Sequence, residues 1–478
     1  MARVLAYTSP ARGHLFPVTA ILDELLRRGH EVVLRTLASQ VGLMQARGFD
    51  AAPIDPAIER IGHDDYRART PLGAQKRAMR VFCARAEHDA GDLRRAIDEV
   101  GPDALLVDIN AWGALAVAEA WGGAWAAWCP YPLPLPSGDA PPFGPGLRPA
   151  RGPLGRLRDA ALTPIVFGSL ERLVTPRVNE VRERVGVPPM SGAADLFLAP
   201  PLLLYLTAEP FEYPRSDWPQ SVRLVGPCDW DPPDEPPGWL DEIETPIVLV
   251  TTSSEFQDDG RLVRCALEAL AGEQLHVVAT LPSGDPMSFD APPNSRVLSF
   301  VPHGPMLDRA ACAITHGGMG VTQKALARGV PVCVVPFGRD QFEVARRVQV
   351  AGAGTRLPAK RMTPKRLRAA VKAAIRRDEG ARRIAESYRK AGGAGAAADA
   401  VEELIRSPLH DRARRLTLDR ASDPGRRAGR GAGTRRGRRC RRRSRRRRRA
   451  RSSSAAAARG TVRRRRRGAA PGCAGRPR

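Results

Sequence analysis

The feature that most constrains the fold is an alternation of short β-branched runs with helical apolar patterns, which occurs twice along the chain. Such alternation is typical of parallel βαβ units, in which a helix crosses over between neighbouring strands. The first series predicts strands at 4–7, 32–36, 104–108 and 124–129, and the second predicts strands at 247–251, 276–281, 297–301, 312–315 and 332–336. We therefore predict an α/β protein with two doubly wound Rossmann-like domains facing across a cleft.

A proline-rich segment separates the two series. Residues 226–237 read Gly-Pro-Cys-Asp-Trp-Asp-Pro-Pro-Asp-Glu-Pro-Pro, a composition that stiffens a linker. We predict an N-terminal domain over 1–225, a linker over 226–245 and a C-terminal domain over 246–407, with its last helix at about 394–406. A further stretch rich in proline and glycine, 130–153, predicts a long mobile loop. Segments 64–90 and 130–176 are expected to line a substrate pocket.

The formal net charge of +25 is confined to the end of the chain. Residues 408–478 contain 28 Arg, no Lys and 3 Asp, so residues 1–407 are charge-balanced. The segment has almost no apolar residues and is predicted to be disordered. A nucleic-acid-binding arm is one interpretation, but a high-GC gene read past a frameshift yields such residues, and we favour that artefact.

The cysteines and the N-terminus predict a cytoplasmic protein. The eight cysteines are scattered without metal-binding spacing, so we expect neither a metal nor disulfides. The first residues enter a strand pattern directly, without the apolar core of a signal peptide. The most apolar window, 111–129, carries Glu119 and several glycines, and predicts a buried helix and strand rather than a membrane span.

The most specific motif lies in the second series. It reads Thr-His-Gly-Gly-Met-Gly-Val-Thr over 315–322, followed by Gly-Val-Pro at 329–331 and Asp-Gln at 340–341. A strand that ends in glycines before a helix with free N–H groups forms an anion site suited to a diphosphate. His316 can donate a hydrogen bond to a phosphate oxygen.

This ordered set resembles the donor-binding signature of the nucleotide-sugar-dependent glycosyltransferases, both the plant secondary-product enzymes and the bacterial macrolide or natural-product type. The resemblance implies the two-domain architecture called GT-B and a UDP- or dTDP-sugar donor. It implies that His316 contacts the diphosphate and that Asp340 and Gln341 bind sugar hydroxyls. The other donor-binding residues implied by position are Ser254, Phe300, His303, Gly318, Gly320 and Thr322. For Phe300 and His303, a core aromatic and a surface histidine are the alternatives.

One position departs from the family. Where relatives usually have a glutamate that accepts from both ribose hydroxyls, this chain has Lys324. An ammonium only donates hydrogen bonds, so Lys324 is unable to make that contact. How the ribose is recognised therefore stays open.

The first series supplies a candidate catalytic base. The strand at 4–7 runs into Thr-Ser-Pro-Ala-Arg-Gly-His-Leu-Phe-Pro over 8–17, which resembles the family's Gly-His-x-x-Pro. A neutral imidazole such as His14 is suited to remove a proton near pH 7. Asp108, at the end of another strand, matches the family's aspartate that pairs with the protonated ring. Helix capping is the structural alternative for both residues.

We therefore expect an inverting, metal-independent glycosyltransferase that moves a hexose to a hydroxyl of a small apolar acceptor, with no cofactor beyond the sugar donor. No Asp-x-Asp pair occurs in the donor half, which favours metal independence. The alternatives are a non-catalytic auxiliary protein of the same fold, a nucleotide-sugar epimerase and a lipid-linked sugar transferase. We expect no specific nucleic-acid partner and no membrane span.

Overall fold

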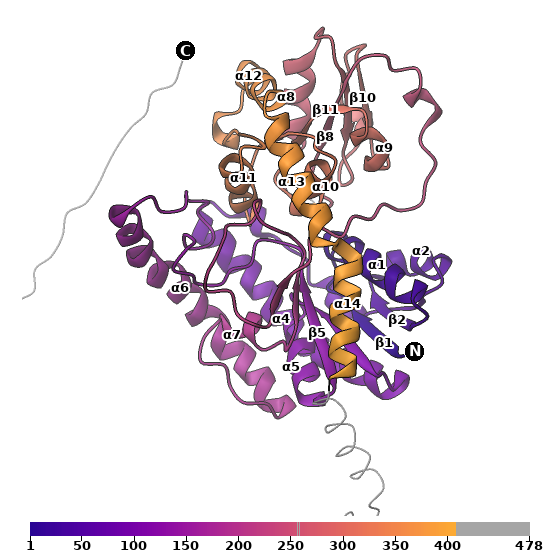
Figure 1. Cartoon of the computed structure of the whole chain (residues 1–478), viewed down its shortest axis with the longest axis vertical. Helices are drawn as coiled ribbons and strands as arrows, with labels where there is room; N and C mark the ends of the chain where they lie inside the picture. The colour runs from indigo at the N-terminus through magenta and orange to yellow at the C-terminus, as the bar shows by residue number, and fades with distance from the viewer. Residues whose placement is uncertain (256, 258, 408–478) are drawn as a thin grey trace, which may run out of the picture. The chain divides into compact units, whose positions relative to one another are not determined.

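The computed structural model describes residues 1–255, 257 and 259–407, which form two parallel β-sheets covered by helices (Figure 1). The first sheet has seven strands in the order β3-β2-β1-β4-β5-β6-β7. Their bounds are β1 (Arg3–Tyr7), β2 (Glu31–Thr36), β3 (Asp50–Pro53), β4 (Ala104–Asp108), β5 (Ala124–Cys129), β6 (Leu203–Tyr205) and β7 (Val222–Leu224). All neighbouring strands in this sheet are parallel.

The second sheet has six strands in the order β10-β9-β8-β11-β12-β13, again parallel throughout. Their bounds are β8 (Ile247–Thr251), β9 (His276–Thr280), β10 (Ser295–Leu298), β11 (Ala310–Thr315), β12 (Val332–Val334) and β13 (Gly354–Arg356). The prediction of two doubly wound α/β domains is confirmed.

Helices cover both faces of the first sheet. On one face, α1 (Arg12–Arg27) packs beneath the even-numbered residues of β1, and on the other α4 (Pro71–Val100), α5 (Trp112–Trp121) and α6 (Pro153–Val185) pack on the odd-numbered ones. The fully buried strand residues on both faces are what a central parallel strand requires. Shorter helices complete this half, namely α2 (Val41–Ala46), α3 (Pro56–Arg60) and α7 (Asp195–Leu198).

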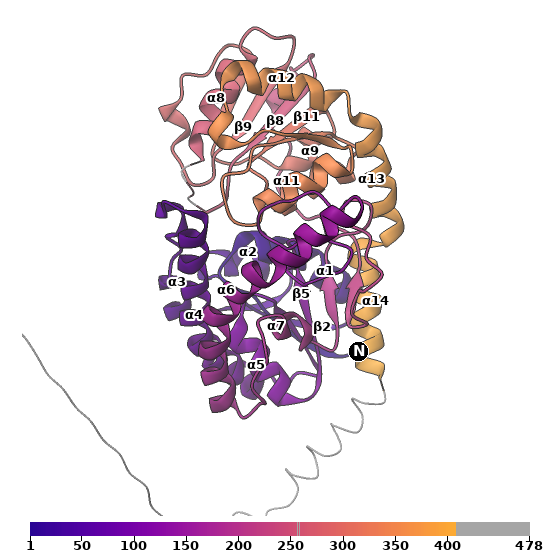
Figure 2. The ribbon, with the colours of Figure 1, turned by 90° about the vertical axis from the view of Figure 1, so that its left-hand side faces the viewer.

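The second sheet is covered in the same way. Helices α8 (Gly260–Leu270) and α12 (Pro364–Ile375) lie side by side on one face (Figure 2). The core on the other face includes α9 (His303–Leu307), α10 (Met319–Ala327), α11 (Gln341–Val350) and α13 (Asp378–Ala391). The segment 226–237 between the two sheets has no helix or strand.

The last described helix, α14 (Gly393–Arg406), packs against the first sheet although it follows the second in sequence (Figure 1). Its apolar residues Ala397 and Val401 belong to the same buried cluster as α1. The chain therefore crosses back after Gly392, whose positive φ of 89° lets α13 end and α14 begin.

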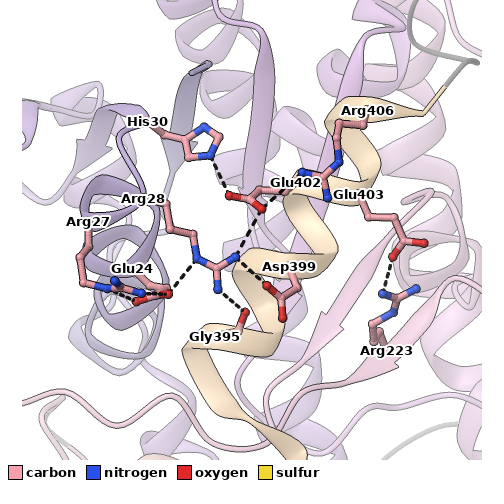
Figure 3. A network of polar contacts seen from close by, with 10 residues as sticks. All are labelled: Glu24, Arg27, Arg28, His30, Arg223, Gly395, Asp399, Glu402, Glu403 and Arg406. Carbon is pink, nitrogen blue, oxygen red and sulfur yellow. Dashed lines mark hydrogen bonds and ion pairs between the residues drawn. The ribbon is translucent and has the colours of Figure 1, made fainter.

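Polar contacts fix α14 to the first half (Figure 3). Arg28, which follows α1, bonds Asp399 at 2.6 Å and the carbonyl of Gly395 at 3.2 Å. His30 lies 3.1 Å from Glu402, and Arg223 bonds Glu403 at 2.7 Å. The segment predicted to be disordered, 408–478, lies outside the described residues.

Candidate active site

In each sheet, two neighbouring strands end side by side at the topological switch point, where the strand order reverses. In the first sheet β1 and β4 are neighbours, with Tyr7 opposite Val107. In the second sheet β8 and β11 are neighbours, with Thr251 opposite Thr315. Because ligands of open α/β sheets bind at such switch points, the segments that follow these four strands are the candidate site.

His14 and Asp108 meet at the first switch point. His14 lies in the first turn of α1, and its Nδ1 is 2.9 Å from Oδ1 of Asp108 at the end of β4. The Asp108 carboxylate also accepts hydrogen bonds from the backbone N–H of Ser9 at 2.9 Å and of Asn110 at 2.9 Å. A carboxylate that accepts these bonds is held ionised, so Nδ1 carries the proton and Nε2 keeps its lone pair.

The pairing of His14 with Asp108 raises the pKa of the imidazole and lowers the pKa of the carboxyl, as a catalytic base requires. Burial disfavours the charged imidazolium, but the Asp108 carboxylate, together with the charges of Glu255 and Asp340, raises the pKa of His14. Burial likewise opposes ionisation of Asp108, but His14 and the hydrogen bonds from Ser9 and Asn110 lower the pKa of the carboxyl. The His14 ring is therefore a stronger base than a free imidazole.

Asn110 is a site residue that sequence reasoning missed. Its amide nitrogen is 3.3 Å from Nε2 of His14, and its amide oxygen accepts from the hydroxyl of Tyr131 at 2.8 Å. The Tyr131 bond sets the amide so that its NH₂ group faces the ring. The only signal in the sequence was its position two residues after Asp108.

His316 ends β11 at the second switch point. Its side chain is buried, and its Nδ1 has no hydrogen-bond partner within the described part of the chain. Burial lowers the pKa of His316 to about 4, a hydrogen bond to the backbone of Thr251 opposes the shift, and the charge of Arg339 adds to it. His316 is therefore neutral near pH 7, and its buried Nδ1 is left without a hydrogen-bond partner.

The glycines beside His316 have different roles. Gly317 has φ 101°, and a Cβ there would lie 2.9 Å from that of Gln341. A Cβ at Gly318 would lie 2.7 Å from Nε2 of His316, so this glycine makes room for the ring, whereas a Cβ at Gly320 would meet nothing within 4 Å. Gly317, which the motif analysis did not single out, is the residue that requires glycine for its backbone.

Two residues predicted to contact the sugar donor, Thr322 and Gln341, make hydrogen bonds within the protein instead. The Thr322 side chain is fully buried, and its hydroxyl is 3.2 Å from that of Thr315. The Gln341 amide oxygen accepts from the N–H groups of Phe337 and Gly338, at 2.8 and 3.0 Å. In this arrangement both side chains shape the loops of the site.

Asp340 caps the start of α11 and is partly exposed. Burial raises the pKa of its carboxyl, while the charges of Arg339 and His14 oppose that shift. The charge state of His14 therefore influences the titration of Asp340.

The three remaining predicted donor residues lie at separate places. Ser254 is exposed in the loop after β8. Phe300 follows β10 and is 47% exposed, so it is not a core aromatic. His303 opens α9, where Nε2 is 3.3 Å from the Thr280 hydroxyl, and burial and the Lys324 charge lower its pKa to about 4.

Lys324 binds acidic groups of the linker. Its ammonium is 2.6 Å from Asp231 and 3.0 Å from Asp229, and it donates to the carbonyl of Trp230 at 2.8 Å. Arg328 also bonds Asp229, at 2.5 Å. The linker therefore contains an Asp-x-Asp sequence, but both of its carboxylates are ion-paired with α10.

Residues 130–152 of the predicted loop have no regular secondary structure and are anchored to α11, whereas Pro153 begins α6. The Glu343 carboxylate accepts from the N–H groups of Gly144 and Gly146, each at 2.8 Å. Glu343 also bonds Arg347 at 2.9 Å, and Arg347 pairs with Glu212 at 2.9 Å. This buried network holds the loop beside the Asp340–Gln341 turn.

Arg339 joins the two halves on another side. Its Nε and Nη2 bond the two oxygens of Asp65 at 2.9 and 2.8 Å, and its Nη1 bonds Glu255 at 2.7 Å. Asp65 belongs to the segment 64–90 of the first half, and Glu255 follows Ser254 in the second. None of these three residues was singled out by the motifs.

Within the described residues, no group of three or more His, Cys, Asp or Glu side chains could hold a metal ion. None of the helices described is both long enough and apolar enough to cross a membrane. The six cysteines in the described part of the chain are free thiols.

Comparisons with known proteins identify relatives of this chain. Residues 264–405 match the family model described as Erythromycin biosynthesis protein CIII-like, C-terminal domain. The chain is 34% identical over 429 residues to 4'-demethylrebeccamycin synthase of Lentzea aerocolonigenes, an alignment that covers 84% of this chain and 100% of that protein.

Solved structures give the same result for the fold. The glycotransferase of kitacinnamycin matches with a TM-score of 0.64 and 26% identity, covering 84% of this chain and 98% of that one. The glycosyltransferase VinC, solved in complex with dTDP, matches with a TM-score of 0.63 and 21% identity, covering 84% and 99%. The architecture is therefore GT-B.

Proposed function

We propose that this chain, which belongs to the glycosyltransferases of macrolide and natural-product type, transfers a hexose from a nucleoside-diphosphate sugar to a hydroxyl of a small apolar acceptor. The transfer inverts the configuration at the anomeric carbon of the sugar. The observation that carries the proposal is the pairing of His14 with Asp108 at 2.9 Å. A non-catalytic relative would have no need of this oriented base.

In the proposed reaction, Nε2 of His14 removes the acceptor's hydroxyl proton as the oxygen attacks the anomeric carbon of the sugar. The bond between that carbon and the β-phosphate oxygen breaks, and its electron pair leaves with the nucleoside diphosphate. Asp108 stabilises the imidazolium that forms. Asn110 gives up its contact with Nε2 when the acceptor hydroxyl arrives.

The second switch point is proposed to bind the donor. The free Nδ1 of His316 and the N–H groups at the start of α10 are suited to the diphosphate, and Asp340 to the sugar hydroxyls. Gln341, Thr322 and Gly318 keep these groups in place, Gly320 lets the diphosphate approach the start of α10, and Ser254, Phe300 and His303 border the nucleotide. We propose that no metal takes part and that the reaction occurs in the cytoplasm.

A donor screen tests the proposal. UDP- and dTDP-hexoses are incubated with a panel of polyphenol and macrolide acceptors, and the products are read as a hexose mass shift. The His14→Ala variant is the control and should lower turnover on an aliphatic alcohol by about 10²- to 10⁴-fold. Wild-type turnover by His14→Ala on such an acceptor would contradict the proposed base.

A further inference from the structure

Arg339 has three bonds of unequal strength. Both oxygens of Asp65 accept from its guanidinium, and the Asp65 side chain is only 6% exposed. Glu255 accepts through one oxygen, and its side chain is 34% exposed. A bidentate buried pair is stronger than a single partly solvated one, so the Glu255 bond is the one that an incoming anion can replace.

Arg339 differs from the other candidate cations of the site. His316 has a pKa of about 4 and is neutral near pH 7. Lys324 is paired with Asp229 and Asp231. His14 must be neutral to act as a base. Arg339 is also paired, but one of its two carboxylate partners, Glu255, is held by a single bond and is 34% exposed, so this guanidinium can exchange that partner for a diphosphate.

The backbone of Arg339 also indicates a constrained side chain. Its φ of 50° is the one positive value among the non-glycine residues described. This conformation costs of order 1 kcal/mol or more and persists where surrounding contacts require it. Arg339 directly precedes Asp340, and its charge acts on His316 of the second switch point.

We propose that Arg339 is a donor-binding residue whose guanidinium exchanges Glu255 for the nucleoside diphosphate while it remains bound to Asp65. The proposal rests on the proposed function and specifies how the leaving group is neutralised. As the bond from the anomeric carbon to the β-phosphate oxygen breaks, the electron pair stays on that oxygen and Arg339 stabilises its charge. Asp65 is then a positioning residue that holds the arginine between the halves.

Calorimetric titration with UDP and dTDP tests this assignment, with uridine and thymidine as competitors that lack phosphate. Arg339→Met should bind the matching diphosphate about 10- to 100-fold more weakly, the scale of lost hydrogen bonds to a charged group, with nucleoside affinity unchanged. Glu255→Gln is the matched control, and it should bind the diphosphate as tightly as the wild type or more tightly, because the competing carboxylate is gone.

Unchanged diphosphate affinity in folded Arg339→Met would overturn the proposal and leave Arg339 as an ion pair between the halves. Should that variant fail to fold, Arg339→Lys decides the question, because lysine keeps the charge without the bidentate fork. It should lose about 3- to 10-fold in diphosphate affinity, and no loss would overturn the proposal. If His316→Ala binds the diphosphate more weakly but Arg339→Met does not, this inference is rejected and the proposed function stands. If the wild type binds no diphosphate, the proposed function is rejected.

Discussion

The basicity of His14 depends chiefly on the Asp108 carboxylate, with smaller contributions from the charges of Glu255 and Asp340. Asp108 is fully buried, and its hydrogen bonds from Ser9, Asn110 and His14 leave it no other orientation. The imidazole must be neutral to accept a proton, so activity rises with pH through the raised pKa of His14.

Asp108→Asn should shift the rise of activity at low pH, the acid limb of the pH–rate profile. Without the Asp108 carboxylate, the main effect that opposes burial is lost and the pKa of His14 should fall, so the rise of kcat/KM should shift to lower pH. The maximum should also fall, by less than in His14→Ala, because the imidazolium loses its partner. A pH–rate profile measures both effects, and an acid limb at the wild-type position would contradict the assignment of Asp108.

Lys324→Glu should weaken donor binding and lower stability. Restoring the family's glutamate would place three carboxylates together, with Asp229 and Asp231 left without the ammonium that they now share. Lys324→Met is the control, since it removes the charge without adding another. Calorimetry and thermal unfolding compare the two, and tighter donor binding by the glutamate variant would show that the linker aspartates readily move away.

At the scale of elements, the packing of α14 on the first half is stabilised by Arg28 and not by its neighbour Arg27. Both arginines bond Glu24, but only Arg28 also reaches α14 in the network of Figure 3. Arg28→Ala should therefore lower the free energy of unfolding by about 1 kcal/mol, and Arg27→Ala by less than about 0.5 kcal/mol. Denaturant unfolding measures both, and equal losses would contradict a specific role of Arg28.

The strands show what periodicity predicts and what it misses. Periodicity predicted β1, β2, β4, β5 and β8 to β12, because these strands lie in β-branched or apolar runs. The missed strands β3, β6, β7 and β13 have only three or four residues. The structure places β10 at Ser295–Leu298, earlier than the predicted 297–301, because its pairing stops where β9 ends at Thr280.

The site was predicted where a motif follows a central strand, as for His14, Asp108 and His316. Contacts between distant segments were not predictable from spacing. Asp231 lies 93 residues from Lys324, and Asp65 lies 274 residues from Arg339. The helix at α14 was predicted, but its apolar stripe does not specify which sheet it covers.

At the scale of the whole molecule, residues 1–407 should transfer sugar as well as the full chain. They are charge-balanced and contain both sheets, while the +25 excess lies beyond them. The full chain should also bind polyanions, with an affinity that falls steeply as salt rises. Parallel transfer assays at matched protein concentration check this, and loss of transfer in 1–407 would make the final segment part of the enzyme.

The return of α14 to the first sheet affects how such enzymes can be recombined. A chimera with one crossover in the linker would bring a foreign α14 with its donor half, and the foreign helix would have to fit α1 and the partners of Arg28. A second crossover at Gly392–Gly393 would keep the native helix with its own sheet. Each sheet is therefore exchangeable as a folded unit with all of its own helices only when the chain is cut twice.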